Sequence, residues 1–140
     1  MDFSASSAHA LKYAASLATQ LGAKITLLNV VQPVATPDFS TYPLMMDNGK
    51  VIGQIKRELE RVPDSQGVDS TLIEKVMVRN GIPFREITLA AESLKADLII
   101  LSTHGYTGLK HVLLGSTAER VVRHSKCPVL VVRSLECDFA

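Results

Sequence analysis

The sequence predicts an α/β protein in which helices cover a parallel sheet. The first observation is a set of short apolar runs without alternation, such as residues 98–101, which are typical of strands buried on both faces. The second is that these runs alternate with longer segments in which apolar residues recur every three or four positions, as in amphipathic helices. Strands that alternate with helices form parallel sheets, and ligands bind such sheets beyond the carboxyl ends of the strands.

The first half of the chain predicts helix, strand, loop and helix in that order. The first helix follows residues 2–4 and ends at Gly22, which suits the residue after a helix. Its buried stripe is formed by Leu11, Ala14, Ala15, Ala18 and Leu21. Residues 24–31 predict a buried strand, and residues 32–48 predict a loop rich in Pro, Thr and Asp. A second helix then buries Val51, Ile52, Ile55, Leu59 and Val62 and exposes a charged face.

The second half repeats the alternation. Residues 63–67 predict a turn and residues 72–78 a strand, after which Pro83 stands in the first turn of a third helix. The buried stripe of that helix is formed by Phe84, Ile87, Ala91 and Leu94. The strand at residues 98–101, a fourth helix and a last strand at residues 129–132 follow. The tail after residue 133 has no strong signal.

Length and composition suit a single domain over residues 1–140. The hydrophobic fraction of 46% is enough for a sizeable core, yet no apolar run reaches the length of a membrane-spanning helix. The net charge of +1, without a long run of like charges, argues against a nucleic-acid-binding surface. The four histidines lack the spacing of metal ligands. Cys127 and Cys137 do not form a C-x-x-C pair, so reduced thiols in the cytoplasm are expected.

The connection between the strand at residues 98–101 and the fourth helix resembles a phosphate cradle. Gly105 follows the strand, and Gly115 comes after nine further residues. Ser116 and Glu119 have the spacing of a capping box, with Ser116 as the N-cap. A glycine before a helix lets backbone amides face an anion, which the helix dipole favours. The same pattern equally suits a strand-to-helix connection with nothing bound.

The sequence contains no catalytic constellation. It has no G-x-x-x-x-G-K-[ST], no G-x-G-x-x-G and no G-x-S-x-G motif. His104, beside the cradle, suits a phosphate contact or assistance to hydrolysis, although a locally hydrogen-bonded loop residue is the favoured reading. Lys110 and His111 suit phosphate neutralisation and a solvated loop equally. The residues alone therefore give an enzyme no catalytic constellation to rest on.

The spacing Gly105-x9-Gly115-Ser116, followed by residues 119–122 and 127–132, resembles the C-terminal half of a universal stress protein domain. Nucleotide-binding members of that family carry G-x2-G-x9-G-[ST]. The last two glycines fall on Gly105 and Gly115 and the hydroxyl on Ser116, whereas the first glycine falls on Ser102, which is a departure. Residues 2–4, 27–30 and 81–83 also match the family pattern, so the resemblance covers nearly the whole chain.

The resemblance implies a site for ATP or AMP, with or without Mg²⁺. Asp2 and Val30 would border adenine and ribose, Val30 through its backbone, and Leu101 would line the base pocket. The alternative role of Asp2 is to cap the first helix. The side chain of Ser102 would either crowd the nucleotide or add a hydrogen bond. The implied nucleotide-binding residues are Asp2, Val30, Leu101, Ser102, Thr103, His104, Gly105, Gly115, Ser116 and Thr117.

Three functions follow from the resemblance and the residues. The leading expectation is a cytoplasmic stress-response protein that binds ATP or AMP, acts as a homodimer and presents a nucleotide-dependent surface to a protein partner. The second is a dimerising module whose pocket stays empty, and the third is a slow Mg²⁺-dependent ATPase. The dimer is expected on Val129, Leu130, Val131 and Val132, because an apolar strand at the edge of a sheet needs a partner.

The resemblance further implies a three-layer sandwich with strand order 3-2-1-4-5. Family members begin with an apolar strand before the aspartate that corresponds to Asp2, and here only Met1 precedes it. The central first strand is therefore expected to be missing from this chain. We expect about six to ten apolar residues upstream in the natural product, lost through a misassigned start or trimming.

Overall fold

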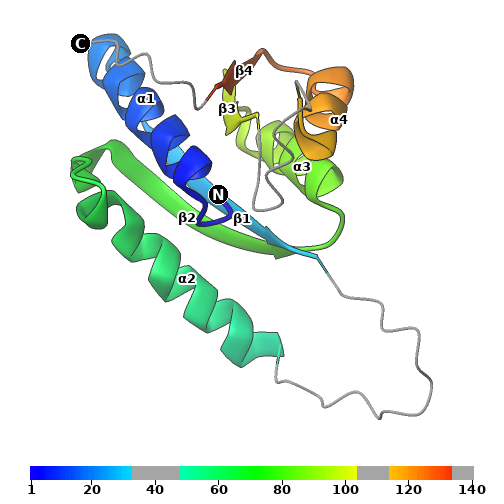
Figure 1. Cartoon of the computed structure of the whole chain (residues 1–140), viewed down its shortest axis with the longest axis horizontal. Coiled ribbons are helices and arrows are strands. Elements are labelled where there is room, and N and C mark those ends of the chain that lie inside the picture. Colours follow the sequence, from blue (N-terminus) through cyan, green and yellow to red (C-terminus); the bar gives the residue numbers. More distant parts are fainter. Residues whose placement is uncertain (33–47, 104–113, 134–140) are drawn as a thin grey trace.

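The computed structural model describes residues 1–32, 48–103 and 114–133, and the chain alternates between helices and parallel strands throughout these ranges (Figure 1). The first half contains α1 (Ala5–Leu21), β1 (Ile25–Val31) and α2 (Asn48–Ser65), followed by the short 3-10 helix η1 (Ser70–Leu72). The second half contains β2 (Ile73–Asn80), α3 (Pro83–Leu94), β3 (Ile99–Ser102), α4 (Ser116–His124) and β4 (Val129–Val132). The predicted α/β class is confirmed; the predicted loop over residues 33–47 and the tail 134–140 lie outside the described residues.

Both ends of α1 follow from local chemistry. The Ser4 hydroxyl oxygen accepts the backbone N–H of Ser7 at 3.1 Å and so caps the first turn. Gly22 ends the helix in the left-handed conformation with φ 62°, as predicted from its position. Leu11, Ala15 and Ala18 are buried as expected. Leu21 is 69% exposed, so the predicted stripe was wrong at the last helical residue, which projects beyond the neighbouring strands.

The predicted turn at residues 63–67 was wrong in its first three residues. Helix α2 continues through Pro63 to Ser65, and Pro63 is buried. A proline at this position cannot donate the hydrogen bond to the carbonyl of residue 59, so the continuation of the helix is held by other contacts, including the burial of Pro63 itself. The carbonyl of Pro63 accepts the N–H of Val68 at 2.9 Å, and this bond closes the chain back toward η1.

The strands form two separate parallel pairs. Strand β1 pairs with β2, from Ile25 opposite Ile73 to Val31 opposite Asn80, and β3 pairs with β4, from Ile99 opposite Val129 to Ser102 opposite Val132. The one continuous sheet with order 3-2-1-4-5 is not present among the described residues. That order and the missing central strand therefore stay predictions.

The main core lies between α1, α2 and the β1–β2 pair. Leu11 and Ala15 of α1 meet Leu27 of β1 and Leu59 of α2, and Leu59 is completely buried. Helices α3 and α4 contact each other and lie away from α2 (Figure 1). Helix α1 also contacts β3 and β4, so it connects the two strand pairs.

Strand β3 was expected to be buried on both faces, and this expectation was wrong. All four of its residues are only partly buried. Within the described ranges β3 pairs with β4 alone, so no strand along its other edge adds to the cover of its apolar side chains. None of the helices in the described residues is long and apolar enough to cross a membrane.

Candidate functional site

The end of β3 and the start of α4 are joined by one short hydrogen bond. The N–H of Gly115 donates to the carbonyl oxygen of Thr103 at 2.7 Å, and Thr103 is 4% exposed. This bond brings Ser102 and Thr103 to Gly115, Ser116 and Thr117, which are five of the predicted nucleotide-binding residues. His104 and Gly105, together with Lys110 and His111, lie outside the described residues.

The predicted capping box was wrong. Helix α4 begins at Ser116, and its N-cap is Gly115, which has no side chain that could cap the first turn. Glu119 therefore stands one position beyond the place that a capping box requires, and its carboxylate pairs with Arg123 at 2.8 Å. Within the described residues no side-chain cap serves the first-turn amides of Ser116, Thr117 and Ala118, and the positive end of the helix favours an anion there.

Gly115 adopts a backbone conformation that does not require glycine. Its φ is −65° and its ψ is 150°, an extended conformation open to any residue. The consequence of glycine here is that no Cβ stands beside the first amides of α4. Close approach of backbone to a phosphate is one of the established uses of glycine at such a position.

Asp2 is held at the start of α1 by Ser4. The Asp2 Oδ1 atom accepts the backbone N–H of Ser4 at 3.1 Å and its hydroxyl at 2.6 Å. The residue between them, Phe3, lies in the left-handed region with φ 61°, which costs about 1–3 kcal/mol for a bulky residue. Ser4 rather than Asp2 caps the helix, so the alternative role of Asp2 as the cap was wrong.

The carboxyl group of Asp2 is kept ionised. Its burial alone would raise its pKa, but hydrogen bonds from Ser4 and Ser7 and the charge of the nearby N-terminal ammonium outweigh burial and lower the pKa below 3.8. An ionised carboxylate only accepts hydrogen bonds. Asp2 is therefore suited to hydroxyl or amino donors of a ligand and unsuited to a phosphate.

Met1 forms hydrogen bonds with the edge of β1 that faces away from β2. The Met1 ammonium donates to the carbonyl of Leu28, and the buried side chain of Asn29 donates to the carbonyl of Met1 at 2.6 Å. Because the Val31 carbonyl accepts Gly81 on the β2 side and carbonyls alternate along a strand, the Val30 carbonyl faces the same edge as that of Leu28. Sequence reasoning missed Asn29 as a positioning residue, although a lone amide in an apolar strand was a usable signal.

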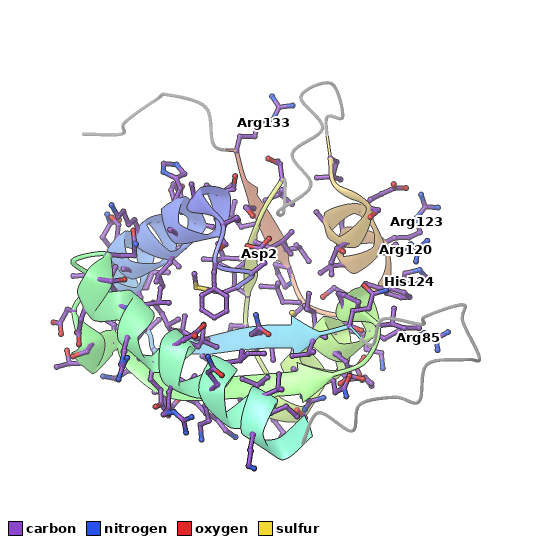
Figure 2. The ribbon with its side chains drawn as sticks, turned by 60° about the horizontal axis from the view of Figure 1, so that its bottom comes forward. Asp2, Arg85, Arg120, Arg123, His124 and Arg133 are labelled. Carbon is purple, nitrogen blue, oxygen red and sulfur yellow. The ribbon has the colours of Figure 1, made fainter. Side chains whose placement is uncertain are left out.

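The predicted residues thus form two groups. Asp2 and Val30 belong to the β1 edge, and the group around Gly115 belongs to the β3–α4 junction; Leu101 is half-buried within β3. Helix α1, which follows Asp2 directly, contacts both β1 and β3. Figure 2 shows Asp2 between β1 and the strands β3 and β4. The N-terminus of α4, which follows β3, suits an anion, and the carboxylate of Asp2, which precedes α1, suits a hydrogen-bond donor. Helix α1 contacts both β1 and β3 and so links these two groups.

The cavity detected among the described residues lies elsewhere. It measures about 200 Å³ and is open to solvent at the end of α3, so it does not coincide with the predicted site. Its lining is formed by Thr88, Ala91, Glu92, Lys95, Ala96, Ser125, Lys126 and Cys127. Among the described residues no three His, Cys, Asp or Glu side chains gather as a metal site would require.

Comparison with known proteins decides the family. The family model described as the universal stress protein family matches residues 1–133. The chain belongs to this family. It is 37% identical over 131 residues to universal stress protein MJ0531 of Methanocaldococcus jannaschii, an alignment that covers 91% of this chain and 75% of the relative.

Solved structures of the universal stress protein family share the fold. The structure of protein MJ0577, also from Methanocaldococcus jannaschii, superposes with a TM-score of 0.74 at 28% identity and covers 98% of this chain and 94% of its own. A universal stress protein in complex with cAMP superposes with a TM-score of 0.65 at 27% identity, covering 95% of this chain and 91% of its own.

Proposed function

We propose that this universal stress protein is a cytoplasmic regulatory protein of the stress response that binds an adenine nucleotide and acts as a homodimer. The observation that carries the proposal is the start of α4, where Gly115 leaves the first-turn amides without a side-chain cap and without a Cβ beside them. Helix starts of this kind bind phosphate groups. The related protein in complex with cAMP supports adenine nucleotides as the ligand class.

The two groups of residues suggest how ATP or AMP would be oriented. The phosphates would contact the amides of Gly115, Ser116 and Thr117, with Gly105 and His104 on the preceding segment. The ribose hydroxyls would donate to the ionised carboxylate of Asp2. That carboxylate repels phosphate, so the polarity of the nucleotide is fixed with its sugar toward β1 and its phosphates toward α4.

The base end of the nucleotide would lie against the strands. The carbonyl of Val30 faces the β1 edge and can accept the adenine amino group, while Leu101 supplies apolar surface. Ser102, the last residue of β3, and Thr103 after it would lie beside the sugar and phosphates. Mg²⁺ would serve as a counterion shared between phosphate oxygens, which is how this ion is often held at nucleotide sites.

The proposed dimer is built on β4. This strand is the end strand of the β3–β4 pair, and its residues Val129 to Val131 remain partly exposed although all are apolar. An apolar edge strand with unpaired backbone groups favours pairing with another strand, and a second copy of the chain offers the same edge. This feature also favours the rival reading, a dimerising module without nucleotide.

Two measurements test the proposal. Freshly purified protein is denatured and the supernatant analysed for nucleotide, and nucleotide-free protein is titrated with ATP, AMP and GTP by calorimetry. We expect bound or titratable adenine nucleotide and weaker binding of GTP. Absence of adenine nucleotide binding, with the dimer intact, would favour the rival module. If wild type hydrolyses ATP to ADP and His104→Ala does not, the result would instead support the slow ATPase.

A further inference from the structure

A cluster of cations surrounds one aromatic ring where α3 meets α4. The guanidinium carbon of Arg120 lies 5.4 Å from the centroid of the Phe84 ring, and that of Arg85 lies 5.9 Å from it. The ring of His124 lies 5.5 Å from the same centroid and is tilted by 37°. Figure 2 shows Arg85, Arg120 and His124 on the same side of the molecule, with Arg133 set apart. We define Phe84, Arg85, Arg120 and His124 as the basic–aromatic cluster.

The charges of Arg85 and Arg120 are not balanced by carboxylates among the described residues. The nearby acidic side chains are engaged elsewhere, because Glu119 pairs with Arg123 at 2.8 Å and Glu86 pairs with Arg79 at 3.4 Å. Arg85 and Arg120 are both exposed. A cation–π contact with Phe84 holds each guanidinium near the ring and uses none of its N–H donors, so these donors stay available to an acidic group.

An apolar stripe adjoins these charges on α3. Ile82 is 44% exposed and Leu89 is 51% exposed, which is high for large apolar side chains. Ile82 is the N-cap residue of α3, Arg85 lies in the first turn and Leu89 follows four residues later, so Arg85 and Leu89 share one face of the helix. The surface therefore combines two guanidinium groups with two exposed aliphatic side chains at the N-terminal end and along one face of α3.

We propose that the basic–aromatic cluster and the adjoining Ile82 and Leu89 form a docking surface for an acidic, amphipathic helical segment of a partner protein. Glu or Asp side chains of that segment would bind the guanidinium groups bidentately, and its apolar side chains would cover Ile82 and Leu89. A nucleic acid is the less suitable occupant, because it requires a longer basic stripe and offers no use for the exposed aliphatic side chains.

The docking surface is separate from the proposed nucleotide site. It involves α3 and the C-terminal half of α4, whereas the nucleotide proposal rests on the first turn of α4 and on β1. Either proposal can therefore fail without the other.

The test uses a fluorescent peptide of about four helical turns with Glu and Leu in an amphipathic pattern. Its control is the same peptide with Lys in place of each Glu, and a labelled duplex DNA of mixed sequence provides the nucleic-acid arm. Binding to the full chain is measured by fluorescence anisotropy at low and high salt. The test variant is Arg85→Gln/Arg120→Gln. The matched control is Arg61→Gln/Arg133→Gln, which removes the same charge from exposed arginines outside the cluster.

We expect the acidic peptide to bind, the Lys peptide not to bind, and the Kd of the acidic peptide to rise about tenfold or more in the test variant, because two charge-assisted contacts are lost. The matched control should change the Kd less than about twofold. Phe84→Leu keeps the charges and removes the ring that restrains them, so it should raise the Kd by a smaller factor. Equal effects of the two double variants, no binding of the acidic peptide, or tighter binding of the DNA would overturn the proposal; circular dichroism establishes that each variant is folded.

Discussion

Two adjacent valines of α4 provide a matched test of how this short helix is held. Val121 is completely buried, whereas Val122 is 48% exposed. Val121→Ala removes two methyl groups from a packed environment, at about 0.8 kcal/mol each, and adds the cost of a residual cavity. Alanine is the better helix former by up to about 0.7 kcal/mol, which offsets part of this loss. We expect Val121→Ala to lower the free energy of unfolding by about 1.5–2.5 kcal/mol.

Val122→Ala makes the same chemical change at a position where half of the side chain already meets water. Its transfer loss is roughly matched by the gain in helix propensity, so the free energy of unfolding should change by less than about 0.5 kcal/mol. Urea unfolding followed by circular dichroism gives both values if the m-values stay constant. Equal losses for the two variants would refute the assignment of α4 as a helix anchored by Val121.

The remaining predictions concern Asp2 and the edge of β4. Because the pKa of Asp2 is lowered in the folded state, its charge stabilises the fold at neutral pH and this contribution is lost as pH falls below 3.8. Wild type should therefore be more stable than Asp2→Asn at pH 7, and a difference in unfolding free energy that does not shrink toward pH 3 would contradict this. On β4, Pro128 and Val132 accept hydrogen bonds from β3, so the N–H of Val131 faces the outer edge. Val131→Pro should make the protein monomeric in light scattering while Val131→Ala stays dimeric, and a wild-type monomer at micromolar concentration would rule out the proposed dimer.

The elements of the fold were largely predictable because their signals are local. The succession of apolar runs and amphipathic segments placed the four α-helices and four strands of the described residues within a few positions, although the short helix η1 was missed. The other failures occurred where the residues that pack around a position decide its structure. Helix α2 continues past Pro63, and Leu21 at the end of α1 is exposed.

The start of α4 was predictable to within one residue, whereas the nucleotide site itself stays a prediction. The spacing of Gly115 and Ser116 indicated where α4 begins, yet the sequence could not assign the N-cap between these two adjacent residues, which both suit it. The contact of Asn29 with Met1 depends on the path of the chain before α1, which no periodicity encodes. The basic–aromatic cluster was missed for a similar reason, since Phe84 and Arg120 are brought together only by the packing of α3 on α4.

The measurement that tests the central claim most directly is calorimetry of ATP binding to Gly115→Val. The backbone at Gly115 tolerates valine, so the variant should fold, while its branched side chain occupies the space beside the first amides of α4. Gly53→Val is the matched control, because a Cβ there meets only Arg57 Nη1 at an ordinary 3.7 Å. We predict that ATP affinity falls at least about tenfold in Gly115→Val and is unchanged in Gly53→Val. A folded Gly115→Val protein that binds ATP as tightly as wild type would contradict the phosphate site at the start of α4.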